Sequence, residues 1–162
     1  MAITFDADEI FEMAQQIERN GARFYRTAAQ NAPNPQVKKT LEELADMELD
    51  HLKTFSDLRA ELTAKDSLSA YDPDDQAARY LHAIVEGRIF DAQADPAQKL
   101  TQHQTPRDIL QTAIGLEKDS IVFYLAMKER LTSQTGKEKI DAIIKEEMGH
   151  VLLLKDTLDH LD

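Results

Sequence analysis

The sequence has no cysteine and no tryptophan, and its 162 residues include only five glycines and five prolines. Without cysteine the chain cannot form disulfides, thiolate nucleophiles, iron–sulfur clusters or cysteine-ligated zinc and rubredoxin sites. Any metal ion must therefore be held by glutamate, aspartate or histidine. Basic residues are also few, 19 against 30 acidic ones, which gives a net charge of −11. Because this charge repels phosphates and anionic lipid headgroups, we expect neither nucleic acid nor a membrane surface as a partner.

Long apolar runs and a recognisable leader are absent as well. No stretch of about 18 apolar residues occurs, and the acidic start of the chain has neither the basic region nor the apolar run of a secretory signal. A cytoplasmic location is the resulting expectation. With 42% hydrophobic residues the chain can bury a sizeable core, and we expect one domain over residues 1–162.

The scarcity of glycine and proline favours long helices, and apolar residues recur at helical spacing over most of the chain. Asp6 with Glu9 forms a helix-start pattern, and Asn34 and Thr105 each precede a proline that can open a helix. We find no strand-like alternation in the sequence. The predicted long helices span residues 6–31, 35–64, 106–132 and 135–161.

About forty residues, 65–104, separate two predicted helical hairpins at 6–64 and 105–161. A further cap-and-proline signal predicts a shorter helix near 73–92 within this segment. A helix of about 20 residues spans roughly 30 Å, so the segment can run the length of the bundle and leave the second and third long helices parallel. The predicted fold is therefore all-α, a four-helix bundle of two antiparallel hairpins whose long crossover contains an extra helix.

The two hairpins repeat the same polar residues at an offset of 99 positions. Each half carries a glutamate on its first helix, a tyrosine seven residues later, and a Glu-x-x-His motif on its second helix. The two glutamates of a half are 30 residues apart in both hairpins. The paired positions are Glu18 and Glu117, Tyr25 and Tyr124, Glu48 and Glu147, and His51 and His150.

Hairpin geometry brings the four glutamates to one level of the predicted bundle. Each lies about 15 residues, roughly 22 Å, from the turn of its hairpin, within an apolar helix face that should face the core. Four buried carboxylates would cost many kcal/mol if nothing neutralised them. Since no lysine or arginine shares these faces, bound cations are the simplest remedy.

Four glutamates and two histidines provide oxygen and imidazole ligands suited to two divalent ions. One Glu from each of two helices, with Glu-x-x-His from each of the other two, is the ligand arrangement of di-iron and di-manganese carboxylate bundles. In that arrangement the two Glu-x-x-His glutamates bridge the ions, whereas each remaining glutamate and each histidine binds one ion. The predicted metal ligands are Glu18, Glu48, His51, Glu117, Glu147 and His150.

Four further side chains lie near this constellation. Tyr25 and Tyr124 lie two turns beyond Glu18 and Glu117 on the same helix faces. They are predicted to donate hydrogen bonds to the ligands, with plain core packing as the alternative. Glu86, on the crossover helix, is either an extra metal ligand or a solvated surface residue. Glu146 directly precedes a predicted ligand, but its small neighbours on the helix favour a position at the boundary of the core.

The constellation resembles the rubrerythrin branch of the ferritin-like superfamily, and the resemblance extends over nearly the whole chain. It implies a ferritin-like bundle with a non-haem di-iron centre that reacts with peroxide or dioxygen. Manganese and zinc are the alternative ions for such a centre. The residues that carry the resemblance are Glu18 with Glu48-Leu-Asp-His51 and Glu117 with Glu147-Met-Gly-His150.

Two features of the sequence depart from that family. Rubrerythrins typically append a Cys-rich rubredoxin domain that delivers electrons, and this sequence contains none. We therefore expect an external electron donor such as rubredoxin. Ser120 stands where rubrerythrins carry a second glutamate, three residues after the ligand on the third helix, and that carboxylate is tied to peroxidase chemistry.

The sequence leaves three functions open. The first is a di-iron oxidoreductase that reduces peroxide or dioxygen. The second is a ferroxidase or mini-ferritin that handles iron with the same centre, and the third is a metal-free helical interaction module. Iron storage requires a hollow shell, whereas we expect a homodimer, so the oligomeric mass separates the first two functions.

Overall fold

The computed structural model describes residues 6–61, 76, 79–81, 83, 96–100 and 104–161. These residues form four long α-helices and one short 3₁₀ helix, and no strand occurs among them. The predicted all-α fold is therefore confirmed. The elements are α1 (Ala7–Gln30), α2 (Pro35–Glu61), η1 (Pro96–Lys99), α4 (Pro106–Arg130) and α5 (Gln134–Asp159).

Side-chain caps determine where the long helices begin. At the start of α1, the Asp6 side chain accepts a hydrogen bond from the Glu9 amide while the Glu9 side chain accepts one from the Asp6 amide. Thr105 caps α4 in the same reciprocal way. Helix α5 begins at Gln134, one residue earlier than predicted, because Ser133 provides the capping oxygen.

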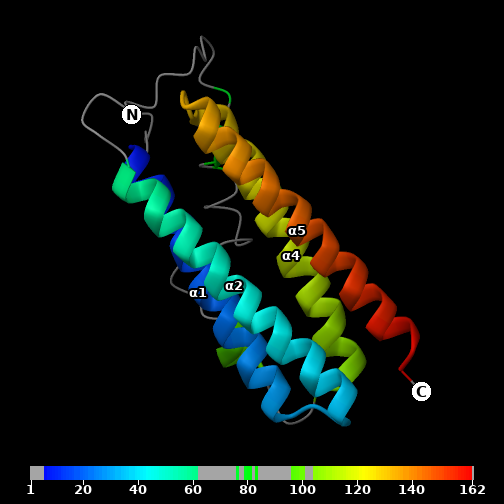
Figure 1. Ribbon diagram of the computed structural model, residues 1–162. Helices are drawn as coiled ribbons and strands as arrows, with labels where there is room; N and C mark the ends of the chain where they lie inside the picture. Colours follow the sequence, from blue (N-terminus) through cyan, green and yellow to red (C-terminus); the bar gives the residue numbers. More distant parts are fainter. Residues whose placement is uncertain are drawn as a thin grey trace.

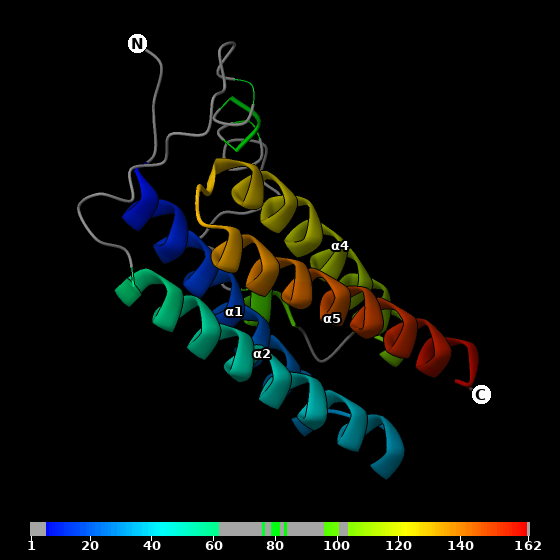
Figure 2. The same ribbon diagram turned by 45° about the horizontal axis from the view of Figure 1, so that its top comes forward.

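The helices pair as two antiparallel hairpins, α1 with α2 and α4 with α5 (Figure 1). The turns of the two hairpins lie at opposite ends of the bundle, so α2 and α4 run in the same direction, as Figure 2 also shows. Across the interface of the hairpins α1 contacts α4 and α2 contacts α5. The predicted four-helix bundle is thus confirmed. None of the helices in the described part of the chain is both long and apolar enough to span a bilayer.

Part of the crossover helix predicted near 73–92 is described. Residues 76, 79–81 and 83 are helical, whereas the rest of the predicted helix, including Glu86, lies outside the described residues. Leu81 is fully buried in the same apolar cluster as Phe11 and Phe123. The crossover therefore contributes to the core of the bundle, and the role considered for Glu86 stays a prediction.

The core consists of two apolar clusters with a polar layer between them. One cluster contains Phe11 and Phe55, and the other contains Phe24 and Leu41. On each long helix the two clusters occupy opposite ends, and the middle of the helix supplies buried glutamates or histidines instead. This arrangement places the polar layer far from both ends of the bundle, where apolar side chains shield it from water on both sides.

Candidate metal centre

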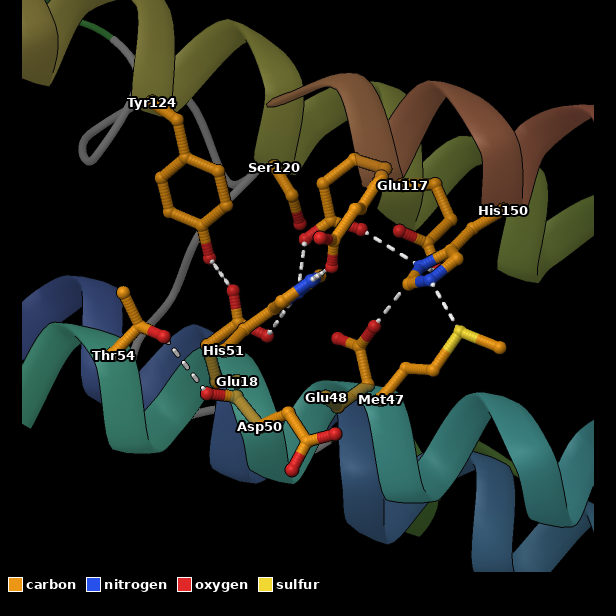
Figure 3. A network of polar contacts seen from close by, with 12 residues as sticks. Glu18, Met47, Glu48, Asp50, His51, Thr54, Glu117, Ser120, Tyr124 and His150 are labelled. Atoms are coloured by element: carbon orange, nitrogen blue, oxygen red, sulfur yellow. Dashed lines mark hydrogen bonds and ion pairs between the residues drawn. The ribbon is translucent and has the colours of Figure 1, made fainter. Parts of the chain in front are cut away.

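The polar layer brings together the six predicted ligands, one from each of α1 and α4 and two from each of α2 and α5. Figure 3 labels all of them except Glu147. All six are buried, with exposed fractions of 3% or less. Their donor atoms form two groups, within each of which the atoms lie within 4.8 Å of one another. The groups are Glu18, Glu48, His51 and Glu147, and Glu48, Glu117, Glu147 and His150.

Glu48 and Glu147 belong to both groups. Two ions held by these groups would therefore share the carboxylates of the two Glu-x-x-His motifs, which is the grouping that the sequence predicts. The structure thus provides two overlapping sets of oxygen and imidazole donors, a combination suited to divalent transition-metal ions. Metal binding by these six residues stays a prediction.

The two histidines point their Nδ1 atoms toward the carboxylates. His51 Nδ1 lies 3.1 Å from Glu147 Oε1 and 3.6 Å from Glu18 Oε2. His150 Nδ1 lies 3.0 Å from Glu147 Oε2 and 3.3 Å from Glu48 Oε1. The imidazole rings are stacked, with centroids 5.5 Å apart. Both rings therefore present the same nitrogen to the centre of the layer.

Several donor atoms of the layer are buried without a hydrogen bond, although each lies within ion-pair distance of another member of the layer. These atoms are Glu18 Oε2, Glu48 Oε1, Glu147 Oε2 and His150 Nδ1. A buried polar atom left without a partner costs about 1–3 kcal/mol, and more when its group is charged. Because all four atoms belong to residues of the two donor groups, an ion held within each group would satisfy them. The side chains present therefore fit a pair of metal ions.

Protons occupy the layer when no ion competes for it. Burial raises the pKa of Glu48 to about 7 and the pKa of Glu117 to about 8. Burial alone would lower the pKa of both histidines, but the adjacent carboxylates outweigh it and raise the pKa of His51 to about 11 and that of His150 to about 12. At neutral pH the metal-free centre therefore holds protonated imidazoles against the carboxylates.

Each tyrosine of the repeat reaches across to the opposite hairpin. The Tyr124 hydroxyl on α4 donates a hydrogen bond to Glu18 Oε1 on α1, as Figure 3 shows. The Tyr25 hydroxyl on α1 donates to Glu117 Oε1 on α4. Burial raises the pKa of both phenols well above the ordinary value, so both keep the proton they donate. Glu18 and Glu117 are thus each oriented by a tyrosine of the opposite hairpin.

The outward-facing nitrogens of the two histidines have different partners. His51 Nε2 lies 2.7 Å from Glu146 Oε2, and His150 Nε2 lies 3.1 Å from Met47 Sδ. The Glu146 side chain is 60% exposed, so it lies nearer the surface than the predicted boundary position, yet its carboxylate reaches the buried imidazole. Neither Glu146 nor Met47 is predicted from the sequence to contact the centre. The 99-residue offset pairs Met47 with Glu146, each directly before a predicted ligand, and this pairing could have indicated that both residues lie beside the centre.

Two small residues also border the site. A Cβ atom added to Gly21 would lie 2.5 Å from Glu48 Oε2, so the glycine leaves the room that this carboxylate occupies. Ser120, at the position where rubrerythrins carry a second glutamate, donates its hydroxyl hydrogen to Leu116 O, 3.0 Å away within α4. Position 120 therefore contributes no carboxylate to the layer.

The fold and the site define a ferritin-like helical bundle, and comparisons with known proteins agree. The rubrerythrin family model matches residues 9–88, which include all of α2. A crystal structure from Thermotoga maritima, described as a ferritin-like diiron-carboxylate protein, is similar over 97% of each chain with a TM-score of 0.76 and 25% identity. An uncharacterized protein of Archaeoglobus fulgidus is 39% identical over 54 residues, 33% of this chain and 84% of that protein. The chain belongs to the rubrerythrin-like branch of the ferritin-like superfamily.

The variant Gly21→Ala tests whether the absence of a side chain at position 21 positions the Glu48 carboxylate. We expect Gly21→Ala to keep the fold, because the group that must move is the end of the flexible Glu48 side chain. Zinc affinity should nevertheless fall about tenfold, since the Glu48 carboxylate shared by the two donor groups is displaced. Gly115→Ala on α4 is the matched control, because its added Cβ meets nothing within 4 Å. Equal zinc affinities of the two variants, measured by competition with a chelator, would contradict this role of Gly21.

Metal binding should release protons and should become tighter as the pH rises. The groups whose pKa is raised to about 7, 8, 11 and 12 hold protons near neutral pH that a metal ion must displace. At lower pH a larger fraction of these groups is protonated, so protons compete more strongly with the metal ion for the same atoms. Calorimetric titration with zinc at pH 6 and pH 8, in buffers of different ionisation enthalpy, measures both effects. Tighter binding at pH 6, or no proton release, would argue against this account.

Proposed function

We propose that the centre binds two iron ions and that the protein is an oxidoreductase that reduces peroxide or dioxygen. The observation that carries this proposal is the buried pair of donor groups that share Glu48 and Glu147. Bound there, two ferrous ions would supply the two electrons that, with two protons, convert one hydrogen peroxide to two waters. The rubrerythrin family match and the similarity to a protein described as diiron-carboxylate support iron as the metal.

The donor groups indicate which side chains would hold each ion. Glu18 and His51 would bind one ion, Glu117 and His150 would bind the other, and the remaining two glutamates would bridge. Tyr124 donates its hydrogen bond to Oε1 of Glu18, while Oε2 of the same carboxylate has no hydrogen-bond partner. The tyrosine therefore occupies one oxygen of the Glu18 carboxylate and would leave the other available to an ion.

The surrounding core encloses the centre between apolar side chains. Apolar clusters lie on both sides of the polar layer, and Phe55 packs on the Tyr124 ring with centroids 4.9 Å apart. A buried layer of this kind strengthens the electrostatic interactions within it and restricts water. No cysteine for a rubredoxin-type site occurs in this sequence, so we propose that electrons come from an external donor such as rubredoxin.

A ferroxidase or iron-handling function is the second candidate, and Ser120 favours it. The Ser120 hydroxyl bonds within α4, so the centre lacks the additional carboxylate that the family resemblance ties to peroxidase chemistry. Iron storage would also require a hollow assembly. We propose a homodimer instead, which is supported by Met148 and Leu152, two exposed apolar side chains one turn apart on α5. Sedimentation separates a dimer from a shell of many subunits.

Loading with ferrous iron tests the proposed function directly. Anaerobic refolding with iron should give about two ions per chain, and mixing with hydrogen peroxide should consume one peroxide per two ions before the reaction stops. Turnover should resume only when a reductant is supplied. Stopped-flow absorbance and elemental analysis measure these quantities, with Glu147→Ala as the control that removes a shared ligand. Fewer than one ion per chain would refute the proposal, and uptake of many ions per chain would favour iron storage.

The tyrosine hydrogen bonds can be tested separately from folding. Tyr124→Phe removes the donor to Glu18 and keeps the aromatic ring, so we expect an almost unchanged fold but about tenfold weaker metal binding. Tyr80→Phe, at an exposed tyrosine, is the matched control and should leave the affinity unchanged. Chelator competition measures the affinity, and thermal unfolding of the metal-free variants checks the fold. Identical affinities for the two variants would leave Tyr124 with a packing role only.

A further inference from the structure

The two halves of the centre differ in the residue that directly precedes each shared glutamate. At this position α2 has Met47 and α5 has Glu146, which the 99-residue offset places in equivalent positions. Each side chain reaches across the bundle to the histidine of the opposite hairpin. The glutamates, histidines and tyrosines of the centre are identical in the two halves. The two halves therefore differ in the residue that contacts the outer nitrogen of each histidine.

The two partners differ in how strongly they hold an imidazole. An ionised carboxylate only accepts hydrogen bonds, so Glu146 keeps a proton on His51 Nε2, and a metal ion that displaced the other proton would meet the lone pair of Nδ1. A neutral thioether is only a weak hydrogen-bond acceptor, so Met47, whose Sδ lies 3.1 Å from His150 Nε2, supports that imidazole much less than a carboxylate would. Figure 3 shows Met47 and His150 facing each other in this way.

Carboxylate support of this kind orients a metal-binding histidine and increases its basicity. Loss of such an outer partner typically lowers metal affinity about 10- to 100-fold. Glu146 is partly exposed, so water weakens its contribution and the lower end of that range applies. The contact nevertheless acts on only one of the two donor groups, the one that contains Glu18 and His51.

We propose that the two metal positions are inequivalent. The position formed by Glu18 and His51 binds its ion first and more tightly, because Glu146 supports its histidine. The position formed by Glu117 and His150 binds second and exchanges its ion more readily, because only Met47 supports its histidine. This inference rests on the proposed metal centre and adds an order of occupancy, with Glu146 and Met47 as positioning residues that act through the histidines.

Titration of the metal-free protein with cobalt(II) tests the order of occupancy. We expect two binding steps in calorimetry and in the cobalt absorption spectrum, with affinities that differ about tenfold. Glu146→Gln should weaken the first step about tenfold and bring the two steps together. Met47→Glu should strengthen the second step, because it gives His150 the carboxylate that His51 already has. Met47→Leu should change little, since it replaces one weak partner with a side chain of similar volume.

A control separates the hydrogen bond from the general effect of charge. Glu129→Gln removes one exposed carboxylate on α4 and should leave both steps unchanged. Two equal steps in the unaltered protein would overturn the inference while leaving the proposed metal centre intact. Equal weakening of both steps by Glu146→Gln, or no strengthening by Met47→Glu, would overturn it as well. No cobalt binding at all would refute both the inference and the proposed function.

Discussion

The structure depends on the burial of four carboxylates in one layer of a helical bundle. Ionised carboxylates in so dry a position are costly unless opposite charge compensates them, and the four carboxylates lie within ion-pair distance of His51 and His150. Protons on His51 and His150 provide this compensation in the metal-free protein, and the unsatisfied donor atoms indicate that metal ions would do so better. The apolar clusters on either side keep the layer dry, which strengthens the attraction between the carboxylates and any bound cation.

The duplicated hairpin explains how one short chain builds a site of six donors. Each half supplies the same glutamate, tyrosine and Glu-x-x-His, and the opposite orientation of the hairpins brings the two sets together at mid-height. The halves are tied to each other at the site itself, because Tyr25 and Tyr124 each bond to a glutamate of the other hairpin. Positions outside the repeated motif are free to differ, and there the pair Met47 and Glu146 makes the two ends of the site unlike one another.

Much of this architecture was predictable because it is encoded in local and periodic features. Helical periodicity and caps such as Asp6 depend on residues a few positions apart, so the sequence indicated the helices to within about three residues where both ends are described. Residues that reach the site from outside the repeated motif were harder to predict. The room that Gly21 leaves beside Glu48 depends on how closely α1 and α2 pack, which residue spacing does not give. Glu146 was interpreted as a boundary residue, and its contact with His51 arises only between hairpins.

The sequence by itself therefore determined the helices, the pairing of the hairpins and the six residues of the centre, because the 99-residue repeat and the equal distances from the turns follow from residue spacing alone. Only the tertiary structure decided which hairpin orients each glutamate, which oxygen atoms lack a hydrogen bond, and which side chain meets the outer nitrogen of each histidine. Those features depend on the rotation and separation of packed helices. Such distances join residues far apart in the chain, and no local pattern records them.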